Sequence, residues 1–192
     1  MKSILGIDLS LNSTGLCIRT DALQQFAGTI DSVSHPGVLN KKGYSFFLID
    51  FPRPTKKKPG PSREEKWNHI VERVRFFADH ADEVILEDYA FGAIGRGKSI
   101  LCEIGGIVRF TLNDMDVPYI LVSPTTLKRF VGSPGSKSMI PKEVLKRWKI
   151  DLDSDDLADA LVLTKIGEAI EDPNADHVTV YQRAALEAAS LI

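Results

Sequence analysis

The sequence predicts an α/β domain in which helices flank a five-stranded mixed sheet. The runs SILGID and TGLCIRT, separated by a loop rich in Asn and Ser, are typical of a hairpin of buried strands. DEVILED is a near-continuous apolar run, as found in strands that are covered on both faces of a parallel arrangement. Strand-like and helical segments then alternate toward the C-terminus, which is the order expected of an α/β layer.

Local patterns predict the remaining elements. QQFAGTI is a candidate third strand, and YSFFLID is another strand-like run whose relation to it the sequence leaves open; a loop of Gly, Pro, Asn and Lys separates the two, and PYILVS is the fifth strand. The basic segment FPRPTKKKPGPS belongs in an exposed loop because its prolines cannot continue a helix or a central strand. Pro124 and the region Gly132–Gly135 are expected to form turns. The predicted helices span Arg63–His80, Ser99–Leu112, Lys142–Lys149, Ser154–Glu171 and Val178–Ser190.

Length and composition are those of a single globular domain covering residues 1–192. The chain is 43% hydrophobic and 26% charged, which excludes disordered and fibrous classes. The first ten residues, MKSILGIDLS, have too short an apolar run for a signal peptide, and no apolar window approaches the length of a membrane span. We therefore expect an intracellular, cytoplasmic protein without a membrane partner. The net charge of −2 argues neither for nor against a polyanionic partner.

Two cysteines lie far apart in the chain. Cys17 and Cys102 both fall in apolar runs and lack the spacing of metal ligands. We predict that both are buried free thiols and not a disulfide or a zinc site.

Acidic residues mark three of the predicted elements. Asp8 ends the first strand, Glu87 ends the strand DEVILED, and the stretch DLDSDDLADALVL supplies Asp155, Asp156 and Asp159 to the last long helix. If the two strands are adjacent and parallel, their ends lie together. Residues three or four apart share a helix face, so Asp159 points the same way as Asp155 or Asp156. Three elements would then deliver acids to one point.

Such a cluster needs compensating positive charge. Neighbouring carboxylates repel one another and lose hydration, and a divalent cation reverses that interaction. Oxygen ligands suit Mg²⁺ or Mn²⁺. For Asp155 and Asp156 a simpler explanation is equally available, because acids are favoured in a first helical turn that Asp153 or Ser154 caps. Asp159 lies past that turn, between apolar residues, where a metal explains it better.

Four stretches together resemble the RuvC-type Holliday-junction resolvases of the ribonuclease H-like superfamily. They are ILGIDLSLNSTG, VILEDYAF, LKRFVGSPGSKSMI and DDLADALVLTKIG, and they occur in family order between residue 4 and about residue 167. The resemblance implies a ribonuclease H-like fold and a metal-dependent endonuclease that cuts DNA four-way junctions by paired symmetric nicks. It implies two Mg²⁺ or Mn²⁺ ions and products with 5′-phosphate and 3′-hydroxyl ends.

The resemblance also assigns the metal ligands. They fall on Asp8, Glu87, Asp156 and Asp159, and Asp155 replaces Asp156 if the helix is rotated. These residues would be the catalytic site. To make two symmetric nicks the protein should be a homodimer, and the helix with Gly105 and Gly106 is a candidate interface because small residues let backbones approach.

DNA contacts are implied on the same basis. The DNA-contacting lysines of the family fall on Lys128 and Lys137. Tyr89 and Phe91 bracket the position of an aromatic residue at the junction centre, where a ring can stack on an unpaired base. Basic neighbours would hold further phosphates, namely Arg129 and Lys142.

Two departures from the family pattern stand out. Leu-Ser-Leu follows Asp8 where the family has Pro-Gly-Ser, and the segment Arg53–Ser62 is an added basic loop that either contacts DNA or is a solvated lysine run. Such departures are typical of a phage-encoded or otherwise divergent resolvase acting in a bacterial cell.

Three other functions fit part of the pattern. A ribonuclease H or a flap nuclease would keep the fold and change the substrate. GIDLSLNSTG also resembles the phosphate loop of actin-like and sugar-kinase folds, but those folds need two such halves, which 192 residues hardly hold. An inactive DNA-binding module is disfavoured because every expected ligand position is acidic.

Overall fold

The computed structural model describes residues 2–10, 12–19, 38–52, 55, 59–89, 96–132 and 139–192. Within these residues six strands form one mixed sheet in the order β3-β4-β2-β1-β5-β6. The strands are β1 (Ile4–Asp8), β2 (Ser13–Arg19), β3 (Val38–Lys41), β4 (Tyr44–Asp50), β5 (Glu83–Glu87) and β6 (Tyr119–Val122).

In the described residues the sheet contains one strand more than the five predicted. β3 is a short, largely polar strand that pairs antiparallel with β4, in a region predicted as a loop of Gly, Pro, Asn and Lys. Lys42 and Gly43 join the two strands, both with positive φ, which the tight turn requires. Four residues with little apolar character do not predict a strand by themselves. They form one because they pair with β4. The expected strand QQFAGTI lies outside the described residues.

The helices in the described part of the chain are α1 (Arg63–Ala78), α2 (Arg96–Asp114), α3 (Pro124–Val131), α4 (Ile140–Trp148), α5 (Asp155–Glu171) and α6 (Val180–Glu187). Five of them match predicted helices with small shifts at the ends. α3 was missed, because Pro124 was expected to form a turn. The side chain of Ser123 caps this helix, Pro124 occupies its first turn, where no N–H is needed, and Gly132 ends it with a φ of 79°.

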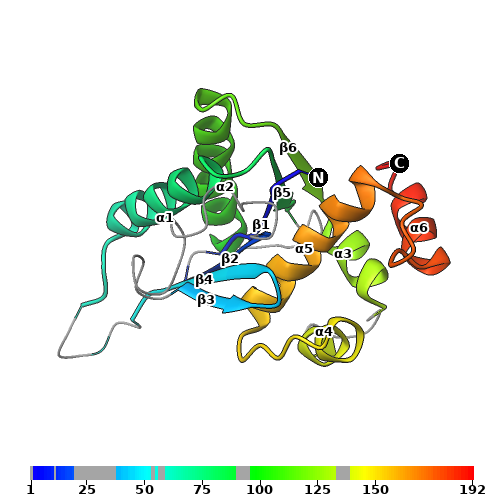
Figure 1. Cartoon of the computed structure of the whole chain (residues 1–192). Coiled ribbons are helices and arrows are strands. Elements are labelled where there is room, and N and C mark those ends of the chain that lie inside the picture. Colours follow the sequence, from blue (N-terminus) through cyan, green and yellow to red (C-terminus); the bar gives the residue numbers. More distant parts are fainter. Residues whose placement is uncertain are drawn as a thin grey trace.

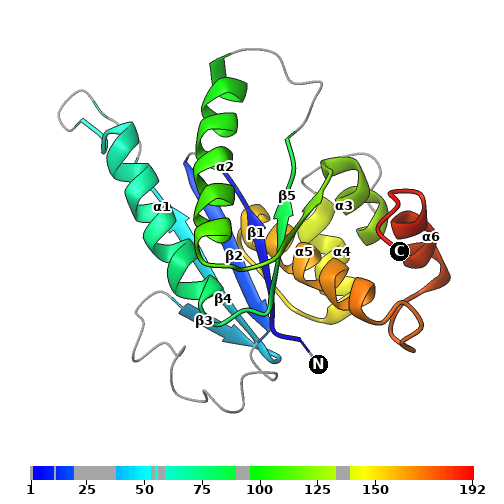
Figure 2. The same ribbon diagram turned by 90° about the horizontal axis from the view of Figure 1, so that it is seen from above.

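The helices form a layer on each side of the sheet (Figures 1 and 2). α1 and α2 cover one face, where Leu5, Ile7 and Leu86 lie in the core. α5 crosses the other face, accompanied by α3, α4 and α6, and its core includes Ile4 and Ile85. Each strand therefore buries alternate side chains under different helices, and α5 is the helix that covers the central strands.

Glycines in the sheet and in α5 allow a close approach. A Cβ atom on Gly6 would stand 2.2 Å from the carbonyl oxygen of Ala160, and one on Gly15 would stand 2.1 Å from that of Asp156. Gly167 on α5 would likewise collide with Ile4 and Ile85. The backbone of α5 thus rests directly on β1 and β2. Because Gly15 pairs with Asp8, this contact brings the first turn of α5 to the end of β1.

The two cysteines differ, and the prediction that both are buried is half wrong. Cys17 is buried under α5, and burial raises the pKa of its thiol well above the ordinary value. Cys102 is exposed on the solvent side of α2, which a local apolar run does not reveal. Both are free thiols, as predicted.

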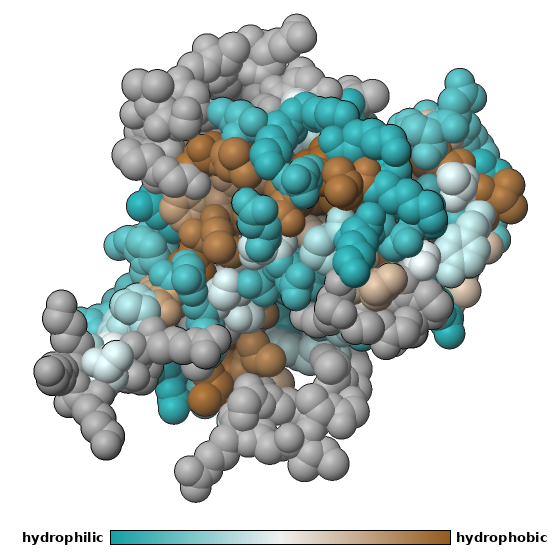
Figure 3. Space-filling view, turned by 90° about the horizontal axis from the view of Figure 1, so that it is seen from below, coloured by the Kyte–Doolittle hydropathy of each residue, from teal (hydrophilic) through white to brown (hydrophobic). Residues whose placement is uncertain are grey.

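Within the described ranges, none of the helices is both long and apolar enough to cross a bilayer. On the face shown in Figure 3, apolar groups are divided by hydrophilic side chains into small areas.

Candidate active site

The acids at the strand ends lie next to each other, as predicted. β1 and β5 are neighbouring parallel strands with Ile7 opposite Leu86, so Asp8 and Glu87, which follow these residues, end the two strands side by side. Side chains alternate along a strand. Because Ile7 and Leu86 face α1 and α2, Asp8 and Glu87 face the opposite side of the sheet, which α5 covers.

The acids of α5 stand over this same edge. Ser154 caps the helix, as one of the two predicted alternatives had it, and Asp155 and Asp156 lie in its first turn. Asp155 is exposed, whereas Asp156 is half-buried and accepts a hydrogen bond of 2.5 Å from the hydroxyl of Ser13 at the start of β2. This arrangement favours Asp156 over Asp155 as the acid closest to the strand ends.

Two of the acids are almost fully buried. Asp8 is 2% exposed and Asp159 is 1% exposed. Asp159 lies one turn beyond Asp156, between the contacts that α5 makes with Gly15 and with Gly6. α5 therefore turns this carboxylate toward the sheet and not toward solvent.

The carboxylates suit a hard divalent cation by their chemistry, because all of them offer oxygen. Asp8, Glu87, Asp156 and Asp159 could hold such an ion at this edge. Their side chains lie along this edge but do not form a complete ligand shell. Across the described residues, no three His, Cys, Asp or Glu side chains stand close enough together to make a preformed metal site.

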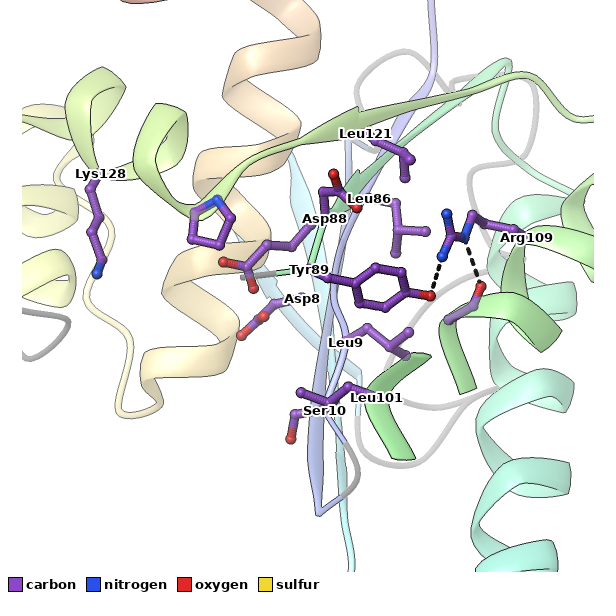
Figure 4. A pocket seen from close by; sticks show the side chains of 13 residues that line it. Asp8, Leu9, Ser10, Leu86, Asp88, Tyr89, Leu101, Arg109, Leu121 and Lys128 are labelled. Carbon is purple, nitrogen blue, oxygen red and sulfur yellow. Dashed lines mark hydrogen bonds between the residues drawn. The ribbon is translucent and has the colours of Figure 1, made fainter. Parts of the chain in front are cut away.

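A cavity of about 270 Å³ opens beside the strand ends (Figure 4). Asp8, Glu87 and Asp88 line it together with Lys128 from α3. Much of the remaining wall is apolar and comes from β5, β6 and α2. Asp88, to which the resemblance gives no role, is therefore a third strand-end acid at this cavity.

Tyr89 is held inside the cavity. In Figure 4 its ring points away from Asp8 and toward Arg109 of α2. The Arg109 guanidinium lies 4.6 Å from the ring centroid and donates to the Tyr89 hydroxyl, which itself donates to the carbonyl of Cys102 at 3.1 Å. Gly105 leaves room for this hydroxyl, since a Cβ there would stand 2.2 Å from it. Within the chain, Gly105 thus packs against the Tyr89 ring, and the role of this helix in a dimer interface stays a prediction.

The predicted DNA-binding residues are placed as follows. Lys128 is half-buried at the cavity, Arg129 is exposed on the neighbouring surface of α3, and Lys142 is exposed in the first turn of α4. Lys137 and Phe91 lie outside the described residues. Sequence reasoning missed Arg109, because its contact with Tyr89 spans 20 residues and carries no local signal.

No family model and no curated protein matches the sequence. The fold, however, is similar to that of solved structures. One is a structure of T. thermophilus RuvC in complex with a Holliday junction substrate, with a TM-score of 0.56 and 14% identity over 98% of this chain and 97% of that chain. Another is a Thermus thermophilus RuvC structure, with a TM-score of 0.55 and 16% identity over the same shares. The protein therefore has the ribonuclease H-like fold of RuvC, as its motifs predicted.

Proposed function

We propose that this protein is a metal-dependent, structure-selective endonuclease that resolves DNA four-way junctions. One observation carries the proposal. Asp8 and Glu87 end adjacent parallel strands on the face that α5 covers, and α5 seats the buried Asp159 against that same face. Acids from three elements at the carboxyl edge of an α/β sheet are a costly arrangement unless a cation binds there.

The residues have separate tasks in this mechanism. Asp8, Glu87 and Asp159 would hold the ion, and Asp156, which is fixed by Ser13, would lie beside them. When bound, Mg²⁺ or Mn²⁺ supplies a Lewis acid that activates water and stabilises charge on the leaving 3′ oxygen. The apolar cavity wall limits water around the carboxylates, which strengthens their hold on positive charge.

The DNA would be held by bases around the same edge. Lys128 stands at the cavity and Arg129 is exposed beside it, so both can neutralise phosphates next to the scissile bond. We infer that the protein acts as a homodimer, since paired nicks need two active sites. In the conformation described, Tyr89 faces Arg109, so a stacking role on an unpaired base would require this contact to open.

The test is cleavage of a synthetic four-way junction with Mg²⁺, with Mn²⁺ and with a chelator, mapping both strands. We expect paired symmetric nicks that leave 5′-phosphate ends, only when metal is present. The variant Asp8→Asn should bind the junction as the wild type does and lose at least about a hundredfold in cleavage rate. Cleavage at the normal rate by this variant, or in the chelator, contradicts the proposal.

The same assay separates the related substrates. A flap and an RNA–DNA hybrid of equal length are offered alongside the junction. Faster cleavage of the hybrid would make the protein a ribonuclease H, and single unpaired cuts in the flap would make it a general branch nuclease. Both results would keep the metal site and overturn the proposed substrate.

A further inference from the structure

Arg109 of α2 holds the residue that follows the strand-end acids. Its guanidinium lies 4.6 Å from the ring centroid of Tyr89 and donates a hydrogen bond to the Tyr89 hydroxyl. The Nε atom of Arg109 also donates to the carbonyl of Gly105 at 3.1 Å, so its own helix orients the guanidinium. One side chain therefore contacts both the ring and the hydroxyl of Tyr89.

The Tyr89 hydroxyl is engaged on two sides. It accepts from Arg109 and donates to the carbonyl of Cys102 at 3.1 Å. In Figure 4 the ring points toward Arg109, and the wall of the cavity around it is largely apolar. Hydrogen bonds in such surroundings are stronger than in water, so these contacts fix the ring against α2.

The chain from this ring to the expected metal ligands is short. Glu87, the last residue of β5, pairs with Val122 of β6, and the N–H of Asp88 donates to the Val122 carbonyl at 2.8 Å. Tyr89 follows directly. Its contacts with α2 therefore fix the direction in which the chain leaves the sheet, and a movement of the ring would reach Glu87 through two peptide units.

Glu87 needs this support more than the other acids. Asp8 and Asp159 are 2% and 1% exposed, and Asp156 accepts a hydrogen bond from Ser13. Glu87 is half-buried, and a glutamate has one more rotatable bond than an aspartate. Because ordering a longer side chain costs more entropy, a fixed backbone matters most for this acid.

We propose that Arg109 is a positioning residue of the metal site. By holding Tyr89 against α2, it fixes the backbone of Glu87 and keeps the Glu87 carboxylate beside the acids of β1 and α5. This inference rests on the proposed function, because it gives Arg109 a part in the site that binds the divalent ion. Groups that orient a metal ligand without touching the metal typically change metal affinity by about ten- to a hundredfold when they are replaced.

Mn²⁺ binding to the full-length protein is the readout, measured by calorimetry and by the loss of the electron paramagnetic resonance signal of the free ion. Arg109→Gln should raise the Kd for Mn²⁺ by about tenfold. Tyr89→Phe keeps the ring and removes only the hydroxyl, so it should raise the Kd by a smaller factor. The double variant should weaken binding by less than the product of the two single effects, because both changes break the same contact.

Junction binding in a chelator separates positioning from a direct DNA contact. With the metal removed, Arg109→Gln should bind a four-way junction with the wild-type Kd, because the guanidinium is turned toward Tyr89. Weaker junction binding together with an unchanged Kd for Mn²⁺ would make Arg109 a DNA contact and overturn the proposal.

Arg75→Gln is the matched control. Arg75 of α1 lies 2.9 Å from Asp114, the last residue of α2, so this variant also removes one positive charge and one contact of α2. Arg75 does not line the cavity beside Asp8, and its variant should bind Mn²⁺ with the wild-type Kd. Circular dichroism and urea unfolding check that each variant is folded.

The results separate this inference from the proposed function. Wild-type protein that binds no Mn²⁺ would overturn the metal site itself and the role of Arg109 with it. Binding to the wild type that is unchanged in Arg109→Gln, or equally weakened in Arg75→Gln, would overturn the positioning role and leave the metal site in place. If Arg109→Gln fails to fold, Tyr89→Phe decides the outcome in the same way.

Discussion

The acidic side chains at the two ends of α5 have different surroundings. Near its C-terminus, Glu168 is held by the Tyr44 hydroxyl, by Lys165 and by Arg19, so the fold itself supplies the compensating groups. Near its N-terminus, Asp156 and Asp159 are brought to the edge where Asp8 and Glu87 already stand. An acid embedded in bases serves stability, whereas under the proposed function the acids of three elements would receive a cation from outside.

The sharpest way to break this comparison is to neutralise one acid at each end. Asp159→Asn should lower junction cleavage by at least about a hundredfold, because it removes a metal ligand. Glu168→Gln should leave cleavage nearly unchanged and lower the free energy of unfolding by about 1–3 kcal/mol, because the charged partner that Glu168 offers to Lys165 and Arg19 is lost. Cleavage rates and urea unfolding curves of both variants check this. Equal effects of the two variants on cleavage would show that the two ends do not differ in role.

The close contact between α5 and the sheet can be tested by adding a single methyl group to a glycine of β2. Gly15→Ala should lower the free energy of unfolding by about 1–3 kcal/mol, because the new Cβ meets the Asp156 carbonyl. It should also slow cleavage by displacing the first turn of α5. Gly106→Ala is the control, since a Cβ on this exposed helical glycine meets no atom within 4 Å and should stabilise by up to about 1 kcal/mol. Denaturant unfolding measures both. A neutral Gly15→Ala would mean that α5 is not held by this contact.

The base at the cavity should matter for DNA and not for folding. Lys128→Gln should weaken junction binding several-fold and reduce the slope of log K against log salt by about 1. Lys2→Gln removes the same charge at the opposite end of the sheet, where Lys2 lies 3.4 Å from Glu83, and should change neither quantity. Binding titrations at several salt concentrations provide both numbers. An unchanged salt slope in Lys128→Gln would remove this residue from the DNA interface.

The smallest expected effect concerns the thiols. Because the thiolate is the reactive form, the raised pKa of Cys17 keeps it as an unreactive thiol at neutral pH, and its burial blocks access. The exposed Cys102 should therefore take up iodoacetamide in the native protein while Cys17 does so only after unfolding. Mass spectrometry of the labelled peptides shows which residue reacts. Labelling of Cys17 in the native state would indicate that α5 leaves the sheet readily.

Local patterns predicted the parts of the fold that depend on burial. The apolar run DEVILED became a strand between two parallel neighbours, and Ser154 became the cap of α5. Asp159 stood out because an acid among Ala, Leu and Val is costly, and it is buried under the sheet as that reasoning requires.

Other features depend on contacts that no local pattern contains. β3 has four mostly exposed residues and exists through its pairing with β4. Pro124 is compatible both with a turn and with a first helical position, and packing of Leu127 and Phe130 selects the helix. The hydrogen bond from Arg109 to the Tyr89 hydroxyl joins α2 to the residues that follow β5, so only the assembled fold reveals it.

The central claim is that the acids of β1, β5 and α5 receive one group of divalent ions. Its most direct test is a crystal of the wild-type protein soaked in Mn²⁺, with anomalous diffraction used to locate the ion. We predict a peak at the carboxyl edge of the sheet, bound by Asp8 and by at least one acid of α5. Absence of a peak at that edge, together with a peak elsewhere or with Asp159 turned to solvent, would contradict the account.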